Sequence, residues 1–338
     1  MNIQEFEQFL VELDNNIAKL EQAAQRTANA AAEAEAHKLR SQRDGYVERF
    51  FAKLTPWDNV LLARHPLRPY ALDYVSALCD DFIELHGDRL FGDDGALVGG
   101  LARLAGQSVM VLGQQKGRDL KERQKRNFGY MQPEGYRKAL RLMQLAGKFG
   151  KPVLAFIDTP GADPNVPSEE RGISEAIARN LREMAILPTP TLSVVIGEGG
   201  SGGALGIAVT DRVLMLEHSF YSVIAPEGCA AIIARDATKG AEAARWMKVT
   251  AKDALELGII DGVIKEPLGG AHRDPAATAE AVREAVLATL AELTSLPTPE
   301  LLRQRAVRLR GMGRFETLGG VAGSGGHINP GGHINPGG

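Results

Sequence analysis

Cysteine is nearly absent from this sequence: of its 338 residues, only Cys79 and Cys229 carry a thiol. Two thiols cannot build a disulfide framework, and they cannot supply a four-cysteine zinc site within one chain. We therefore expect a protein of a reducing, cytoplasmic compartment, with no metal site of its own.

Apolar runs long enough for a membrane are absent as well. The acidic stretch MNIQEFEQFLVELDNN lacks the unbroken apolar segment of a signal peptide, and no apolar, uncharged run reaches about 18 residues. The net charge is -3, so no overall positive charge indicates nucleic acid or an anionic membrane as the partner. We expect no contact with a membrane.

Strand and helix patterns alternate between residues 70 and 267. The runs SVMVLGQQ, KPVLAFIDTPG, TLSVVIGEGG, DRVLMLE and FYSVIAPEG are typical of strands that end in Gly or Pro turns. Between them, PEGYRKALRLMQLAGKFG and SEERGISEAIARNLREMAIL have the apolar spacing of amphipathic helices. This alternation predicts an α/β core with parallel strands and a site at their carboxyl ends.

The segments outside this core are helical or rich in glycine. An apolar stripe spaced 4, 3, 4, 3 starts at Phe6, and an Ala-rich run continues it to about His37. The stripe predicts packing either on another helix of an assembly or on the chain's own domain. Asp274 and Thr298, each followed by proline, open two later helices. We expect an N-terminal helical, coiled-coil-like segment at 1–55, a main domain at 56–270, C-terminal helices at 271–315 and a disordered Gly/Pro-rich tail at 316–338.

The segment GEGGSGGALGIA, residues 197–208, follows one of the predicted strands and fits three kinds of site. Gly197, Gly199 and Gly202 match the G-x-G-x-x-G pattern of dinucleotide binding, with Glu217 where a ribose-binding acid would lie. Only about eight residues then separate the turn from the next predicted strand, which is short for the crossover helix of that fold.

The same segment also contains the G-x-S-x-G pattern of a serine nucleophile. Ser201 lies between Gly199 and Gly203, and Asp261 and His272 follow in the order that hydrolases use. No HGG-type oxyanion motif precedes them, so this interpretation is weak.

A third interpretation needs only the backbone. Glycines at the junction of a strand and a helix let a ligand approach main-chain N–H groups, and such groups stabilise an oxyanion. The alternative is that these glycines only permit tight packing of the strand against the helix.

Longer motifs give a more specific indication. The blocks IDTPGA, EERGISEAIARNLREM, VIGEGGSGGAL, YSVIAPEGCA and EPLGGAHR, preceded by LARHPLRPYALDYV and QKGR, resemble the α subunits of bacterial acetyl-CoA carboxylase carboxyltransferase. The stretch TAKDALELGIIDGVI resembles the end of crotonase domains, with Thr250 capping a helix and Gly258 ending it. The resemblance implies an α/β, crotonase (ClpP-like) fold of ββα units for residues 56–270.

The resemblance also implies a reaction and its partners. The family transfers the carboxyl group of carboxybiotin, held on biotin carboxyl carrier protein, to acetyl-CoA, which gives malonyl-CoA for fatty acid synthesis. No cofactor is bound covalently, and an α2β2 assembly with a zinc-ribbon β subunit is expected, together with biotin carboxylase. Membership of that complex also associates the chain with ATP and nucleotide binding.

By the same resemblance, the α subunit's backbone holds the biotin oxygen. We assign this role to the N–H groups of Gly202 and Gly203, with Gly199 and Gly200 shaping the turn. Two further residues are expected to line the biotin pocket, Gly161 and Ala162. Where the family has PGAYPG this chain has PGADPN, so an aromatic contact there is missing.

The stretch KGRDLKERQKRNFG concentrates positive charge and is a candidate for contacts with CoA phosphates, with the carrier protein or with RNA. Its six cations are Lys116, Arg118, Lys121, Arg123, Lys125 and Arg126. Two alternatives to the carboxyltransferase remain open at this point. One is a self-sufficient acyl-CoA hydratase or isomerase that uses Glu198 and Glu227 as acids; the other is nucleic-acid binding through residues 116–126.

Overall fold

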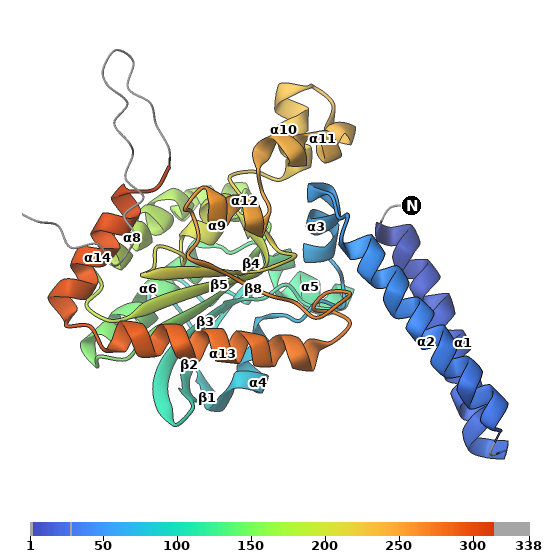
Figure 1. Ribbon diagram of the computed structural model, residues 1–338. Helices are drawn as coiled ribbons and strands as arrows, with labels where there is room; N and C mark the ends of the chain where they lie inside the picture. Colours follow the sequence, from blue (N-terminus) through green and yellow to red (C-terminus); the bar gives the residue numbers. More distant parts are fainter. Residues whose placement is uncertain (1–2, 28, 314–338) are drawn as a thin grey trace, which may run out of the picture.

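One mixed β-sheet organises the part of the chain that the computed structural model describes, residues 3–27 and 29–313 (Figure 1). Its strand order is β1-β2-β3-β4-β5-β6-β8, with the first three strands antiparallel and the rest parallel. The strands are β1 (Cys79–Glu84), β2 (Leu97–Leu104), β3 (Gln107–Gln114), β4 (Val153–Thr159), β5 (Thr191–Gly200), β6 (Arg212–Leu216), β7 (Phe220–Ser222), which pairs with the end of β5, and β8 (Gly262–Ile264).

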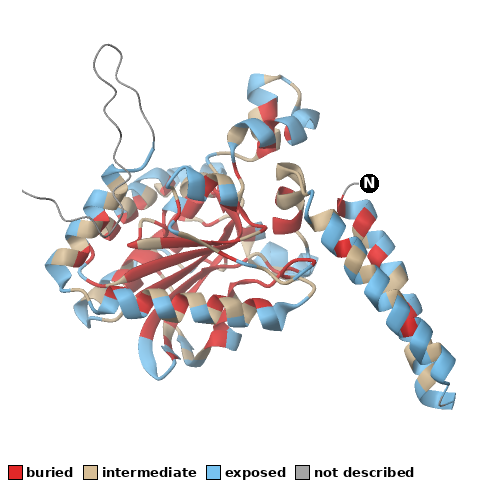
Figure 2. Cartoon of the chain, in the orientation of Figure 1, coloured by how far each residue is buried: buried red, intermediate tan, exposed pale blue. Residues whose placement is uncertain are grey.

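Helices cover both faces of the sheet, and the alternation of side chains along the strands explains why. In β4, Val153, Ala155 and Ile157 pack with α6 (Pro133–Lys148) and α8 (Ile173–Ala185). Leu154 and Phe156 point the other way, toward α4 (Ala71–Leu78) and α13 (Pro275–Thr294). Strands β4 and β5 are therefore buried on both faces, and Figure 2 shows the centre of the sheet in red.

The remaining α-helices of the body connect these elements. They are α3 (Pro56–Ala63), α5 (Leu120–Lys125), α7 (Val166–Glu170), α9 (Ser201–Leu205), α10 (Pro226–Ile233), α11 (Gly240–Met247), α12 (Ala251–Glu256) and α14 (Thr298–Arg310). Among the described helices, none is both long and apolar enough to cross a bilayer.

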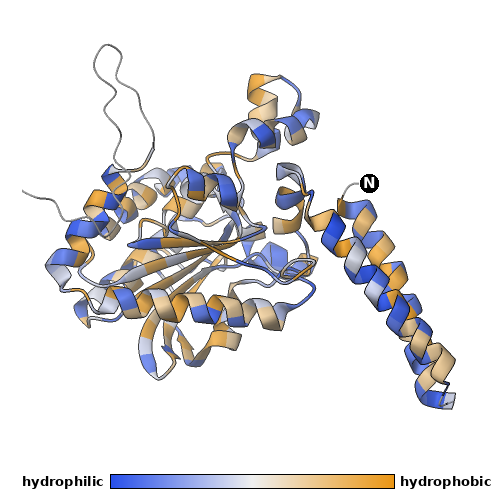
Figure 3. Cartoon of the chain, viewed as in Figure 1, coloured by the Kyte–Doolittle hydropathy of each residue, from blue (hydrophilic) through white to orange (hydrophobic). Residues whose placement is uncertain are grey.

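The N-terminal segment is a helical hairpin that projects from the sheet (Figure 1). Helix α1 (Ile3–Thr27) packs along α2 (Ala30–Phe51), and the ring of Phe6 stacks on Phe50 with centroids 4.0 Å apart. The single helix expected to reach His37 is interrupted, because Asn29 caps the start of α2. The partner of the apolar stripe is thus a helix of the same chain, and Figure 3 shows the hairpin's mixture of apolar and polar residues.

Most predicted ends of elements are confirmed. Thr250 forms a capping box with Asp253 at α12, Gly258 follows that helix with a φ of +70°, and Asp274 caps α13. The strand predicted over 220–228 is wrong beyond Ser222, because proline favours the first turn of a helix and α10 begins at Pro226. The expected tail, residues 316–338, lies outside the described residues.

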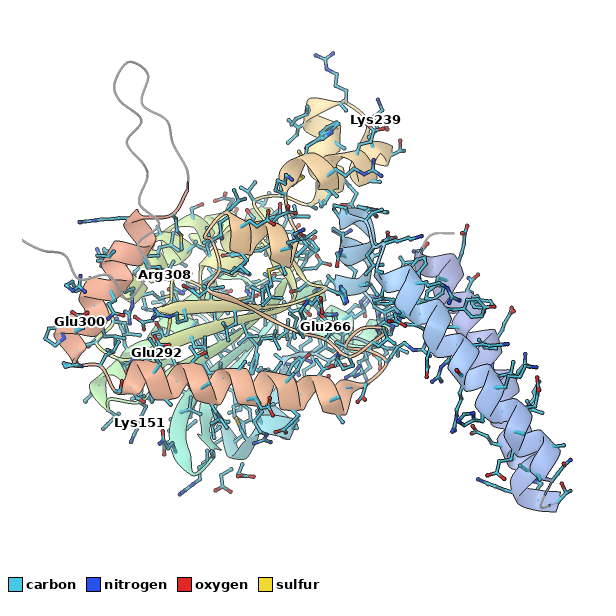
Figure 4. All side chains as sticks on the ribbon, in the orientation of Figure 1. Lys151, Lys239, Glu266, Glu292, Glu300 and Arg308 are labelled. Carbon is cyan, nitrogen blue, oxygen red and sulfur yellow. The ribbon has the colours of Figure 1, made fainter. Side chains whose placement is uncertain are left out.

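Helix α14 is anchored at the amino ends of β5 and β6. The guanidinium of Arg305 is fully buried and donates to both carboxylate oxygens of Asp211, at 2.8 and 2.7 Å. It also donates to the carbonyls of Met184, Leu187 and Thr189. Nearby, Arg308, labelled on α14 in Figure 4, donates to Asp261 at 2.9 Å.

The β1 edge of the sheet is irregular. The pairing of β1 with β2 shifts register between Asp80 and Ile83, and Asp81 adopts a φ of +52°. Asp80 and Asp81 are exposed at this bulge.

Candidate active site at the carboxyl ends of β4 and β5

The glycine-rich segment forms a sharp turn from β5 into α9. A Cβ atom on Gly199 would lie 2.6 Å from the Tyr221 ring, one on Gly200 would lie 2.2 Å from the Pro160 carbonyl oxygen, and one on Gly203 would lie 2.4 Å from Gly161. Tight packing therefore explains these three glycines. Gly202 differs, because the nearest atom to its Cβ would be on Ile177 at 3.7 Å, an ordinary contact distance.

The loop that carries Gly161 and Ala162 lies directly against this turn, so the structure brings these predicted residues together. A Cβ on Gly203 would lie 2.6 Å from the Ala162 nitrogen. The loop is fixed by Thr159, whose hydroxyl donates to the carbonyl of Gly129 at 2.6 Å and accepts from the N–H of Gly161 at 3.1 Å.

The residues that depart from the family's pattern stabilise the same loop. Asp163 is buried, and its carboxylate accepts from the Ser168 hydroxyl at 2.5 Å and from the Asn165 amide at 2.7 Å. These contacts hold the start of α7 without an aromatic side chain.

The main-chain groups of the turn differ in whether they already have a hydrogen-bond partner. The first N–H groups of a helix have no acceptor within the helix, and in α9 these include Gly202 and Gly203. Their carbonyls are already used: that of Gly202 accepts from Gly206 N–H at 3.0 Å, and that of Gly203 accepts from the Gln114 amide at 2.8 Å. Such a turn presents donors rather than acceptors to a ligand, which suits a negatively charged oxygen.

Beside the turn, five ionisable side chains form a connected charge network. Lys116 Nζ lies 2.7 Å from an Asp158 carboxylate oxygen and 3.3 Å from one of Glu198. Arg64 Nε lies 3.0 Å from Glu198, and its Nη1 lies 2.5 Å from Glu227. The side chains of Lys116, Asp158 and Glu198 are 15%, 5% and 8% exposed, so the inner part of this network is shielded from water.

The network controls the charge of its carboxylates. Burial would raise the pKa of Glu198, but Lys116 and Arg64 more than offset it, so the pKa is lowered and the group stays ionised. For Asp158 burial dominates and raises the pKa, although Lys116 opposes it. Glu198 is therefore unsuited to donate a proton as a hydratase acid, and Glu227 is held by the same arginine.

The structure places the cations of the basic stretch in different surroundings. Lys116 belongs to the charge network, Arg118 pairs with Asp73, and Arg126 donates to the carbonyl of Gly95 at 3.0 Å. The exposed cations on α5 are Lys121, Arg123 and Lys125. Residues 116–126 thus present fewer available charges than the sequence indicates.

The serine-nucleophile interpretation is not supported by the geometry. Ser201 has the positive φ of a strained turn, +51°, but its expected partners are engaged elsewhere. Asp261 pairs with Arg308, and His272 is buried beside Glu7, with its Nε2 3.2 Å from the carboxylate.

The dinucleotide interpretation fails as well. The turn leads into a helix of only five residues, and Glu217 pairs with Lys265 at 2.5 Å. The association with ATP and nucleotide binding is likewise unsupported for this chain. ATP use belongs to the biotin carboxylase component.

Among the residues that the structure describes, one group of side chains has the composition of a metal site, although none is expected from the sequence. Potential ligand atoms of Glu7, His65 and His272 lie within 4.8 Å of one another. However, the two imidazole rings pack with centroids 3.9 Å apart, and His65 Nδ1 already accepts from the N–H of Leu67. The ring contact and the bond between His272 and Glu7 join α1 to the body of the protein.

Sequence reasoning missed Arg64, Asp158 and Gln114 as site residues. A signal was present: Asp158 interrupts the buried run VLAFIDT, and an ionisable side chain at the end of an apolar strand needs a partner. The identity of that partner, Lys116, depends on β3 and β4 being neighbours in the sheet, which no local pattern gives.

Comparison with solved structures identifies the fold class. A Pseudomonas malonate decarboxylase hetero-tetramer, solved with coenzyme A, superposes with a TM-score of 0.57 at 18% identity over 71% of this chain and 96% of that chain. The β subunit of Pseudomonas aeruginosa geranyl-CoA carboxylase gives 0.51 at 18% identity, over 71% of this chain and 45% of that one. The fold is that of the crotonase-like carboxyltransferases, as predicted.

Sequence comparison then identifies the family. Residues 3–313 match the family described as acetyl co-enzyme A carboxylase carboxyltransferase-like, and the chain belongs to it. Among relatives named acetyl-coenzyme A carboxylase carboxyl transferase subunit alpha, that of Geobacter metallireducens is 54% identical over 91% of this chain and 98% of its own length. Those of Bordetella pertussis (53%; 92% and 97%) and Azotobacter vinelandii (54%; 93% and 99%) are similar to the same degree.

Proposed function

We propose that this chain is the α subunit of an acetyl-CoA carboxylase carboxyltransferase and works in the first committed step of fatty acid synthesis. It acts on carboxybiotin, held on biotin carboxyl carrier protein, and on acetyl-CoA, and the product is malonyl-CoA. The observation that carries this proposal is 54% identity along 98% of a relative with that name. Residues 56–270 form the carboxyltransferase body in this proposal, with helical segments at 1–55 and 271–315.

The chemistry requires stabilisation of two negative charges. Carboxybiotin loses CO2, which leaves the electron pair on the ureido group and a negative charge shared with its oxygen. The ureido nitrogen then takes a proton from the acetyl methyl group, and the resulting enolate attacks CO2 to form the new carbon–carbon bond. Loss of one oxyanion donor costs about 100- to 1,000-fold in rate in comparable enzymes.

We assign the biotin oxygen to the N–H groups of Gly202 and Gly203, with Gly199 and Gly200 shaping the turn. Gly161 and Ala162 are proposed to line the biotin pocket. The open position at Gly202, the used carbonyls and the close packing of the 161–162 loop support this assignment.

The remaining parts of the site belong to partners. A β subunit with a zinc ribbon would hold the acetyl-CoA oxygen in an α2β2 assembly, and the exposed cations of α5 are available for CoA phosphates or an acidic carrier. Cys79 and Cys229 are both free thiols, which agrees with a cytoplasmic location.

Reconstitution tests the proposal. The full chain, a family β subunit and the carboxylated carrier protein are mixed with acetyl-CoA, and malonyl-CoA is measured by mass spectrometry. We expect product only when both subunits are present. Malonyl-CoA from this chain alone, or none from the complex, would contradict the proposal, and hydration of crotonyl-CoA by the isolated chain would favour the hydratase instead.

A further inference from the structure

The charge network beside the glycine turn is assembled from motifs that are far apart in the sequence. Arg64 comes from LARHP, Lys116 from QKGR, Asp158 from IDTPG, Glu198 from IGEGG and Glu227 from APEG. Burying such charges is costly unless they are paired, and here two cations serve three carboxylates. A stability role alone would be met more simply by apolar side chains, because a buried ion pair often stabilises no better than they do.

The network is joined to the turn at its beginning. The carboxylate of Asp158 accepts from the N–H of Glu198 at 2.9 Å, and Lys116 contacts the same Asp158 oxygen. A Cβ on Gly197 would lie 2.4 Å from that oxygen, so the strand can approach the carboxylate only with glycine at 197. The backbone two residues before Gly200 is therefore fixed by a buried carboxyl side chain of β4.

It is joined to the turn a second time through Gln114, which is fully buried at the end of β3. Its amide oxygen accepts from the N–H of Asp158 at 3.1 Å, and its amide nitrogen donates to the carbonyl of Gly203 at 2.8 Å. The Gln114 amide is thus used in both directions, and it connects β4 to the first turn of α9. Both ends of the segment 198–203 are held by one set of contacts.

We propose that Lys116, Asp158 and Gln114 are positioning residues that fix the direction of the Gly202 and Gly203 N–H groups. That these residues hold the turn in place is inferred from the hydrogen bonds alone. That this affects catalysis rests in addition on the proposed function. None of the three side chains needs to touch the substrate. They act through the backbone of β5 and α9, where a displacement of about 1 Å costs on the order of 100-fold in rate.

The test replaces one member of the charge network, Lys116, and the amide bridge, Gln114, with a side chain of similar length. Lys116→Met removes the cation, and Gln114→Met removes the amide bridge. Lys138→Met is the matched control, because Lys138 is also a buried lysine, with Nζ 2.6 Å from Asp93, but lies on α6 without a contact to the turn among the described residues. Each variant is assembled with the β subunit, and its thermal unfolding is recorded.

Two measurements follow on the folded complexes. We expect Lys116→Met and Gln114→Met to lower kcat about 100-fold while KM for acetyl-CoA stays within about threefold, because the turn acts on the transition state and not on acetyl-CoA binding. We also expect amide hydrogen exchange in a peptide covering 197–206 to become at least about tenfold faster. Lys138→Met should change neither quantity.

The hydrogen-exchange rate at 197–206 tests whether the turn is held in place, whatever activity is measured. Unchanged exchange at 197–206 in Lys116→Met and Gln114→Met, or the same acceleration in Lys138→Met, would overturn it. Unchanged kcat with faster exchange would also overturn it, because the turn would then be displaced without consequence. If the wild-type complex makes no malonyl-CoA, the proposed function fails, while the exchange result still decides whether the network fixes the turn.

Discussion

The two ends of the parallel strands use buried charge in different ways. At the amino ends, Arg305 is buried, and its guanidinium N–H groups donate to Asp211 and to three main-chain carbonyls. At the carboxyl ends, the network begins at buried Asp158 and runs outward to Arg64 and Glu227, whose side chains are 27% and 38% exposed.

This difference indicates that the buried charges at the amino ends anchor a helix, whereas those at the carboxyl ends belong to the candidate site. The Arg305 pair is closed and fully satisfied, so it serves to hold α14 on the sheet. The network at the other end is open toward solvent and adjoins a turn with available N–H groups. Ligands of open α/β sheets bind at the carboxyl ends of strands, which agrees with this division.

The largest effect is expected at the amino ends. Arg305→Leu leaves the buried carboxylate of Asp211 without its cation, and breaking such a pair costs about 3–5 kcal/mol in the free energy of unfolding. Urea denaturation of the full chain measures this loss. Arg303→Leu on the same helix is the control, because that side chain is 58% exposed and pairs with Glu300 at the surface, so a far smaller loss is expected. Equal losses in the two variants would remove the contrast between the ends.

An intermediate effect is expected at the glycine turn, where two neighbouring positions differ. Gly203→Ala places a methyl group 2.4 Å from Gly161 and should destabilise the chain by about 1–3 kcal/mol. Gly202→Ala has room and should leave the melting temperature nearly unchanged, yet lower kcat if biotin approaches the backbone there. Full activity of Gly202→Ala with carboxybiotin would argue against ligand approach at this position. Gly45→Ala, on α2 and remote from the turn, is the control variant.

The smallest expected effect is on the free energy of unfolding and arises at the base of the N-terminal helical hairpin, away from both ends of the strands. Burial, and then the nearby His272, lower the pKa of His65 from 6.5 to about 4. Between these two pKa values His65 is protonated in the unfolded chain but neutral in the folded chain. The free energy of unfolding therefore falls as the pH drops from about 6.5 to 4. Because His65 is partly exposed, about 1 kcal/mol is expected after solvent screening.

His65→Gln removes this titrating group. The difference in unfolding free energy between wild type and variant should therefore change with pH within that window and level off outside it. His37→Gln, at an exposed position on α2, should show no such change. A pH-independent difference for His65→Gln would contradict the proposed cause.

Much of the core could be read from the sequence, because β4 and β5 are continuous apolar runs and α6 and α8 have regular apolar faces. Strands β1, β2 and the three-residue β8 were missed. β1 carries Asp80, Asp81 and Glu84 on an edge, and β2 contains Gly99 and Gly100, so neither has a typical strand composition.

The site was only partly predictable for a similar reason. The four glycines within residues 199–203 are evident from the sequence, and the family motifs also indicate them. What the sequence could not give is which of them are closed by packing, since that depends on the loop at 160–162 lying against α9. The pairing of Lys116 with Asp158 and Glu198 likewise arises from strand order and not from spacing.

The bulge in β1 has a consequence for how copies of this protein meet. A regular edge strand offers a free row of main-chain groups on which another sheet can grow, the first step of many aggregates. Here an approaching strand would encounter the carboxylates of Asp80 and Asp81 and a broken ladder. Both features disfavour extension of the sheet on that side and so oppose edge-to-edge association there.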